Sequence, residues 1–106
     1  MTAYVDVIEA LGDATRRAVL ERLQSGPRSV GEIADGLPVS RPAVSQHLRV
    51  LKDAGLVTDR PAGTRRIYQL APDGLADLRR YIDGFWAQAL AGLKRSAERE
   101  QRRDGS

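Results

Sequence analysis

The stretch from Val39 to Val57 limits the possible fold more than any other part of the chain. Its sequence, VSRPAVSQHLRVLKDAGLV, carries the start, the body and the end of one helix. Ser40 is a good N-cap, since its hydroxyl can accept a hydrogen bond from a backbone N–H that the helix leaves unpaired. Pro42 falls in the first turn, where a missing N–H costs nothing. Gly55 stands where helices commonly end in a left-handed residue.

This predicted helix has two different faces. Apolar residues recur at spacings of four and three and predict a buried stripe of Val44, Leu48 and Leu51. The opposite face offers donors and acceptors without a carboxylate, from Arg41, Ser45, Gln46, His47, Arg49 and Lys52. Such a face suits the donor-and-acceptor-lined major groove of negatively charged DNA. An ordinary solvated helix would also explain this polar face, so its interpretation depends on the elements before and after the helix.

A shorter helix is expected directly before this one. Ser29 and Glu32 form a capping box, in which each side chain can satisfy the other's backbone N–H. The apolar side of the helix is then Ile33, Ala34 and Leu37. Only a tight turn fits between Leu37 and Ser40. Two capped helices joined in this way describe a helix-turn-helix, whose second member reads the DNA groove.

Two further helices are expected nearer the N-terminus. Residues 3–11 place Tyr4, Val7, Ile8 and Leu11 at helical spacing. Asp13 can cap a second helix over 14–24, which the Ser-Gly-Pro of residues 25–27 should end because proline cannot continue a helix.

A basic β-hairpin is expected after Gly55. Residues 56–59 alternate roughly as a strand, a turn is centred on Gly63, and RRIYQL at 65–70 is rich in strand formers. The hairpin carries Arg60, Arg65 and Arg66, and arginines beside a groove helix can reach phosphates or the minor groove. A hairpin whose positive residues only protect its edge is the alternative.

One long helix is expected from residue 73 to about residue 99. Its apolar residues form two neighbouring stripes: Leu75, Leu78, Ile82, Phe85 and Ala89, followed by Trp86, Leu90, Leu93 and Ala97. A single helix of a small domain has difficulty burying both, so one stripe can face the domain and the other a second copy. Aromatic anchors are favoured in interface centres. The alternative is that all of these residues belong to the intramolecular core.

The length and composition predict one soluble domain over residues 1–99 with a flexible tail at 100–106. The 106 residues are 42% hydrophobic and 29% charged. No apolar run approaches the roughly 20 residues of a membrane span, and no signal-peptide pattern is present, so a cytoplasmic location is expected. The segment 98–106 has no apolar residue and should fray.

Charge and residue types narrow the function. Residues 40–66 hold six Lys or Arg and two Asp, a local balance of +4 in a chain of net charge +3, which favours an anionic partner. The chain has no cysteine and one histidine. A nucleophile with a base, or paired carboxylates, cannot be assembled by spacing, so we expect no enzymatic activity, no catalytic residue and no cofactor.

Four blocks match a known family in order: residues 11–23 (LGDATRRAVLERL), 30–37, 44–57 (VSQHLRVLKDAGLV) and 63–70 (GTRRIYQL). Over nearly its whole length the chain resembles the ArsR/SmtB family of small bacterial winged-helix repressors. The resemblance implies a mainly α winged helix-turn-helix with a small β-hairpin, in the order α-α-α-α-β-β-α. It also implies a dimer paired through the first and last helices, with two reader helices in successive major grooves of a near-palindromic operator.

The resemblance also implies site residues. The positions matching DNA-binding residues are Ser40, Arg41, Ser45, Gln46, His47, Arg49, Arg65 and Arg66. Of these, Gln46 and His47 are assigned to base edges, and the arginines mainly to the backbone. The expected dimer interface is Tyr4, Ile8, Leu78, Ile82, Phe85, Trp86 and Ala89.

The chain departs from the metal-sensing members of that family. They commonly place a cysteine pair on the helix corresponding to residues 30–37, or histidines with carboxylates on the terminal helix, and this chain has neither. A transition-metal site is therefore not expected, and the inducing signal is not visible. Asp77 and Asp83 of the terminal helix leave an all-carboxylate site open, but a solvated face explains them more simply. The expected function is that of a sequence-specific DNA-binding repressor. The alternative is a winged-helix module that binds protein through the terminal helix and hairpin.

Overall fold

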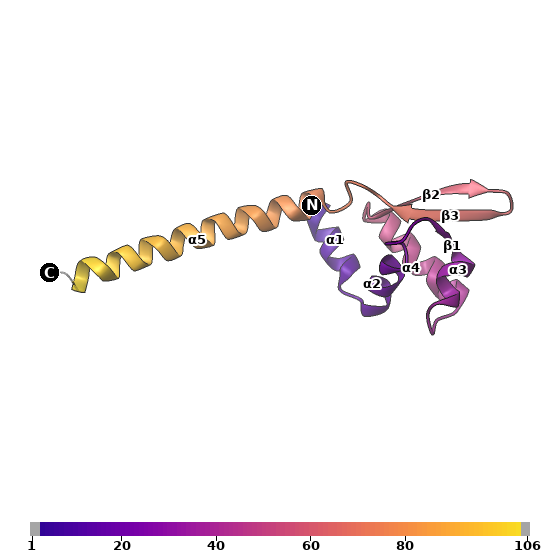
Figure 1. Cartoon of the computed structure of the whole chain (residues 1–106), viewed down its shortest axis with the longest axis horizontal. Coiled ribbons are helices and arrows are strands. Elements are labelled where there is room, and N and C mark those ends of the chain that lie inside the picture. The colour runs from indigo at the N-terminus through magenta and orange to yellow at the C-terminus, as the bar shows by residue number, and fades with distance from the viewer. Residues whose placement is uncertain (1–2, 105–106) are drawn as a thin grey trace.

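The structure is a computed structural model that describes residues 3–104. The elements of this part of the chain are α1 (Ala3–Leu11), α2 (Ala14–Glu21), β1 (Arg28–Ser29), α3 (Val30–Asp35), α4 (Arg41–Asp53), β2 (Val57–Ala62), β3 (Arg65–Leu70) and α5 (Ala76–Asp104). A small body of helices carries the β2–β3 wing on one side, and α5 runs away from it on the other (Figure 1). The predicted winged helix-turn-helix is confirmed, with one additional short strand.

The core forms where the helices of the body meet. The predicted stripe of α4, Val44, Leu48 and Leu51, is fully buried. It packs in one cluster with apolar residues of α1, α2 and α3 and with the start of the wing, among them Val7, Val19, Leu23, Ile33, Leu56 and Val57. Helix α4 is therefore held on its inner face and turns its other face outward.

The predicted starts of the two helices of the helix-turn-helix are confirmed in atomic detail. The Ser40 hydroxyl accepts a hydrogen bond from the backbone N–H of Ala43 at 3.3 Å. The capping box is complete, because the Ser29 N–H donates to the Glu32 carboxylate at 2.9 Å and the Glu32 N–H donates to the Ser29 hydroxyl at 3.3 Å. Those bonds hold the pKa of Glu32 below its ordinary value. Together the caps fix the two helices of the helix-turn-helix at their first turns.

The sheet contains a strand that was not predicted. Strand β1 pairs antiparallel with β3 through Arg28 with Tyr68 and Ser29 with Ile67, so the strand order is β1-β3-β2. Two residues are too few to show an alternating pattern. The pairing ties the start of α3 to the base of the wing. The wing itself turns at Gly63, whose φ of 64° lies in the left-handed region that glycine tolerates.

Two predicted helix ends were wrong. Helix α2 ends at Glu21, because the N–H groups of Leu23 and Gln24 bond three residues back, to Leu20 and Glu21, in tight turns. Helix α5 continues to Asp104, past the predicted end at about residue 99. Its predicted start at residue 73 was also wrong: the helix begins at Ala76, because the N–H groups of Gly74 and Ala76 bond three residues back in tight turns. Side chains at 100–103 are exposed, and a flexible tail over 100–106 stays a prediction whose last two residues lie outside the described range.

Helix α5 is the most exposed element of the fold. The described residues extend 75 × 26 × 25 Å because α5 projects from the body, and its N-terminal part packs beside α1 (Figure 1). Leu78 packs on the core cluster, whereas Tyr81, Ile82, Phe85, Trp86, Leu90 and Leu93 are 42–65% exposed. The alternative that all the apolar residues of this helix belong to the intramolecular core is therefore wrong.

None of the helices within residues 3–104 combines the length and the apolar character that crossing a bilayer requires.

Candidate nucleic-acid interface

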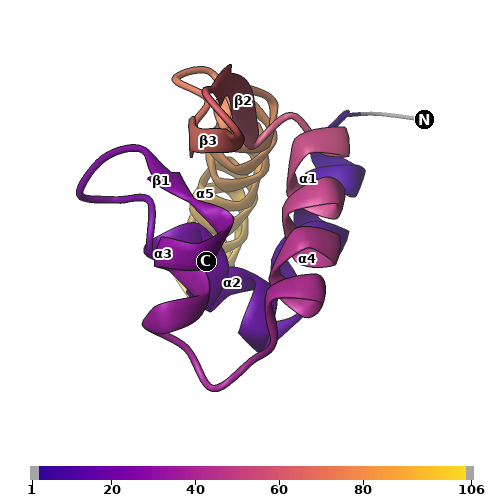
Figure 2. The same cartoon turned by 90° about the vertical axis from the view of Figure 1, so that its right-hand side faces the viewer.

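The outer face of α4 is uncovered and rich in polar side chains. Figure 2 shows α4 along the right side of the body, in front of α1, with no other element over its outer side. Arg41, Ser45, Gln46 and Arg49 are all exposed on it, as the sequence predicts. Among the described residues, neither Arg41 nor Arg49 forms an ion pair. Their charges are thus available to an anionic partner.

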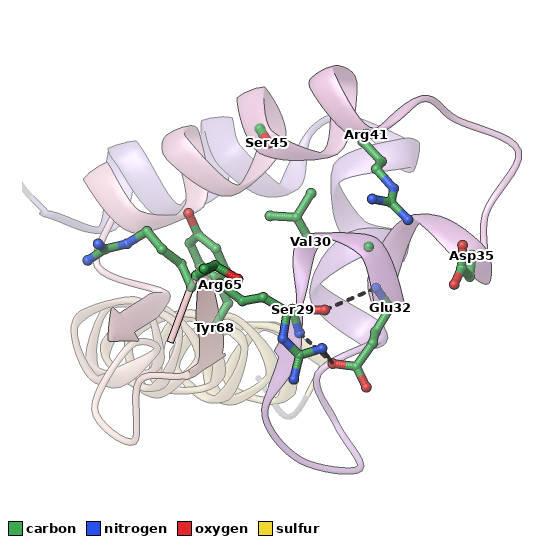
Figure 3. Close-up of a pocket in the computed structure, with 11 residues that line it drawn as sticks. Ser29, Val30, Glu32, Asp35, Arg41, Ser45, Arg65 and Tyr68 are labelled. Atoms are coloured by element: carbon green, nitrogen blue, oxygen red, sulfur yellow. Dashed lines mark hydrogen bonds and ion pairs between the residues drawn. The ribbon is translucent and has the colours of Figure 1, made fainter. Parts of the chain in front are cut away.

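A hollow of about 530 Å³ separates the N-terminal half of α4 from the wing. It brings together four predicted DNA-binding residues from two elements: Arg41 and Ser45 of α4 with Arg65 and Arg66 of β3. Figure 3 shows Arg41, Ser45 and Arg65 around this hollow. The Arg41 guanidinium lies over Gly31 of α3, where any Cβ would come within 3.1 Å of it. The absence of a side chain at Gly31 therefore lets this arginine reach across α3.

Two carboxylates on α3, which sequence reasoning did not include, line the same hollow. They belong to Glu32 and Asp35. The Arg65 guanidinium lies 3.9 Å from the Glu32 carboxylate, and the side chain of Arg65 is 61% exposed. A pair this long between exposed groups is weak, so Arg65 can turn toward a phosphate at little cost. No spacing in the sequence indicates that α3 and the wing face each other, because β1 creates that proximity.

His47 occupies a different place from the other predicted residues. It is half-buried, at the edge of the apolar stripe between Val44 and Leu51. The pKa of Asp13, the N-cap residue of α2, is lowered chiefly by the backbone N–H of Arg16 and to a smaller degree by His47. Partial burial sets His47 apart from Gln46, which is exposed.

Arg66 is engaged by an acidic residue of the neighbouring strand. The Arg66 Nε lies 2.8 Å from one carboxylate oxygen of Asp59, and the Lys52 Nζ lies 2.8 Å from the other. Hydrogen bonds from Lys52 and then Arg66 hold the pKa of Asp59 below its ordinary value. A lowered carboxyl pKa means that the charged, paired form persists through neutral pH and is lost only in acid. Sequence reasoning treated Lys52 and Arg66 as unpaired cations.

Most of the predicted dimer-interface residues are exposed at one end of the body. Ile8, Ile82, Phe85 and Trp86 are exposed, and Ala89 is partly so. Tyr4 stacks on Tyr81 at 4.3 Å between ring centroids. That stack continues through Phe85 to Trp86 at 6.3 and 6.2 Å, in one aromatic row along α1 and α5. Leu78 differs from the others, because it packs on the core cluster of its own body.

Across positions 3–104, no group of three or more His, Cys, Asp or Glu side chains is arranged to hold a metal ion.

Known proteins with similar sequences match nearly the whole chain. A helix-turn-helix domain family matches residues 11–60. The HTH-type transcriptional regulator Rv2034 of Mycobacterium tuberculosis is 63% identical over 92 residues, 87% of this chain and 86% of that protein. The HTH-type transcriptional repressor SmtB of the same species is 40% identical over 78 residues, 74% of this chain and 58% of that protein. This chain belongs to the ArsR/SmtB family of transcriptional regulators.

A solved structure of similar sequence supports the same assignment. The solution structure of the homodimeric winged helix-turn-helix DNA-binding domain Mb0332 from Mycobacterium bovis, a possible ArsR-family regulator, has a TM-score of 0.65 and 31% identity. It covers 83% of this chain and 82% of that one. ArsR/SmtB proteins are transcriptional regulators and not enzymes. The fold and the general function that the sequence predicts are therefore confirmed.

Proposed function

We propose that this ArsR/SmtB protein is a homodimeric repressor that binds a near-palindromic operator in double-stranded DNA. The observation that carries the proposal is the exposed outer face of α4, with Arg41, Ser45, Gln46 and Arg49, beside a wing that presents Arg65 across the hollow. The α4 side chains can reach base edges in the major groove, and Arg65 can reach the adjacent backbone. Repression is supported by the likeness to the repressor SmtB.

The homodimer is supported by α5. Phe85 and Trp86 are each 57% exposed, which is unusual for large aromatic side chains in a small domain and typical of an interface centre. The related domain from Mycobacterium bovis is a homodimer. A two-fold dimer through α1 and α5 would present two copies of α4 to half-sites about one helical turn, roughly 34–36 Å, apart. The dimer would then block polymerase by covering a promoter, in the cytoplasm where the DNA is.

Binding to the protein's own upstream region tests the proposal. Footprinting should reveal one protected site with two-fold symmetry, and a scrambled duplex should bind more weakly. The logarithm of the affinity should fall linearly with the logarithm of the salt concentration, by about 0.9 per phosphate contact. Equal affinity for the operator and the scrambled duplex, or a salt-insensitive complex, would instead favour a winged-helix module that binds protein.

Replacing Gln46 by alanine should relax sequence preference without removing DNA binding. The Gln46 side chain is exposed on the outer face of α4, where a bidentate contact to a base would be worth about 1–3 kcal/mol. We expect the ratio of operator to scrambled affinity to fall by roughly tenfold or more, measured by fluorescence anisotropy on both duplexes.

The matched control is Arg65→Gln on the wing. Loss of a phosphate contact should weaken operator and scrambled duplex alike and lower the salt slope by about 0.9. If Gln46→Ala and Arg65→Gln gave the same pattern on both duplexes, the assignment of α4 to base edges and of the wing to the backbone would be wrong.

A further inference from the structure

Asp59 is the acidic residue at the junction of the two proposed DNA-contacting elements. Its carboxylate binds Lys52, in the last turn of α4, and Arg66, on β3 of the wing, each at 2.8 Å. The side chain of Asp59 is only 7% exposed, whereas those of Lys52 and Arg66 are 51% and 53% exposed. One nearly buried carboxylate thus joins α4, β2 and β3.

The wing is held to the helices at its base. Leu56 and Val57 are buried in the core, and β1 pairs with β3 at Ile67 and Tyr68. Asp59 lies at the same level, opposite Tyr68, and its ion pair with Lys52 links the wing to α4. Among residues 3–104, the other ion pair between the wing and a helix is the 3.9 Å pair of Arg65 with Glu32. Because that pair is long and exposed, the pair of Asp59 with Lys52 is the stronger ionic link between the wing and the helices.

The negative charge of Asp59 allows an electrostatic effect on DNA binding to be distinguished from a positioning effect. A carboxylate beside a DNA-binding surface repels phosphates, so its removal on electrostatic grounds alone would strengthen binding. An aspartate that instead holds the two elements at a fixed angle strengthens binding despite its charge, because an ordered surface has less conformational freedom to lose when the complex forms.

We infer that Asp59 is a positioning residue for DNA recognition, which holds the wing against the reader helix through Lys52 and holds the two strands of the wing together through Arg66. Arg66 therefore acts mainly within the protein, and Arg65 is the wing arginine that faces the phosphates. The expected effect of Asp59 on DNA affinity rests on the proposed function. Its effect on the order of the wing can be measured in the free protein.

The test compares Asp59→Asn with Asp53→Asn. Both changes remove one negative charge, and Asp53 is an exposed residue at the end of α4 that has no ion pair among the described residues. Asp59→Asn should weaken operator binding about tenfold, with the salt slope not becoming shallower. Asp53→Asn should leave the affinity unchanged or slightly higher. In the free protein, the ¹⁵N order parameters of residues 60–66 should fall in Asp59→Asn and not in Asp53→Asn.

Different outcomes test the proposed function and the positioning role of Asp59. If the wild-type protein shows no operator preference, the proposed function fails, while the order parameters still test the role of Asp59. If the wild-type protein binds its operator and Asp59→Asn binds as tightly or more tightly, or if the wing of Asp59→Asn stays as ordered as the wild type, the inference is overturned.

A measurement on the wild type covers the case in which Asp59→Asn does not fold. The Nε–H resonance of Arg66 should remain protected from exchange in the free protein and keep its chemical shift when operator DNA is added. A large shift on addition of DNA would mean that Arg66 leaves Asp59 for a phosphate, which contradicts the positioning role.

Discussion

Replacing Phe85 and Trp86 together by serine is expected to halve the mass of the protein in solution and to remove most of its operator affinity. The two rings are each 57% exposed on α5 and end the aromatic row that starts at Tyr4. Aromatic side chains of this kind bury about 150–250 Å² each and dominate interface energetics. Two linked half-sites bind about 10²- to 10⁴-fold more tightly than one, so a monomer should lose affinity on that scale.

Sedimentation equilibrium and operator titration measure the two effects. Gln88→Ser on the same helix is the matched control, because Gln88 is exposed, polar and outside both apolar stripes. The control should keep the mass and the affinity of the wild type. Circular dichroism should show that the double variant keeps the helical content of its body. An unchanged mass of the double variant would mean that α5 does not form the dimer interface.

Local chemistry explains why much of this fold is predictable. Ser29, Ser40 and Asp13 act as N-caps in the structure, and a side chain within three residues of its own backbone partner needs no tertiary information to be recognised. The stripe of Val44, Leu48 and Leu51 is likewise a property of one helix. Exposed Gln46 and Arg49 follow from it, since they occupy the opposite face.

The features that were missed depend on contacts between distant segments. Strand β1 exists because Arg28 and Ser29 lie against Tyr68 and Ile67, some 40 residues later. That pairing brings Glu32 near Arg65 and places carboxylates in the hollow. In the same way, the sequence shows Lys52 and Arg66 only as two cations, and the shared partner Asp59 becomes visible when the wing folds back beside α4.

Helix α5 shows both the strength and the limit of sequence reasoning. Two apolar stripes on one helix indicated a surface that the body does not cover, and the structure shows one. The expectation that one whole stripe faces the domain was wrong, because Leu75, Ile82 and Phe85 of the first stripe are exposed. The pattern could not separate Leu78, which packs on the core cluster, from Ile82 one turn later, which is exposed. The difference arises because α1 reaches only the N-terminal part of α5 (Figure 1). A nine-residue helix is about 14 Å long and a 29-residue helix about 44 Å.

Replacing Leu48 by alanine is expected to lower the free energy of unfolding by about 2–5 kcal/mol, a large share of the 5–15 kcal/mol of a typical domain. Leu48 has no exposed surface and packs with the core residues of α2 and α3, so the change leaves a cavity. Urea unfolding at a fixed protein concentration measures the loss, because the stability of a dimer depends on concentration.

Gln46→Ala is the control on the opposite face of the same helix, and its stability should stay within about 0.5 kcal/mol of the wild type. Under conditions where Leu48→Ala is folded, its preference for operator over scrambled DNA should equal that of the wild type, whereas the preference of Gln46→Ala should fall by roughly tenfold or more. If Leu48→Ala lost sequence preference while still folded, the two faces of α4 would not be separable into one for stability and one for recognition. The independence of the two faces follows from their positions, since one is closed by the core and the other has no protein neighbour above it (Figure 2).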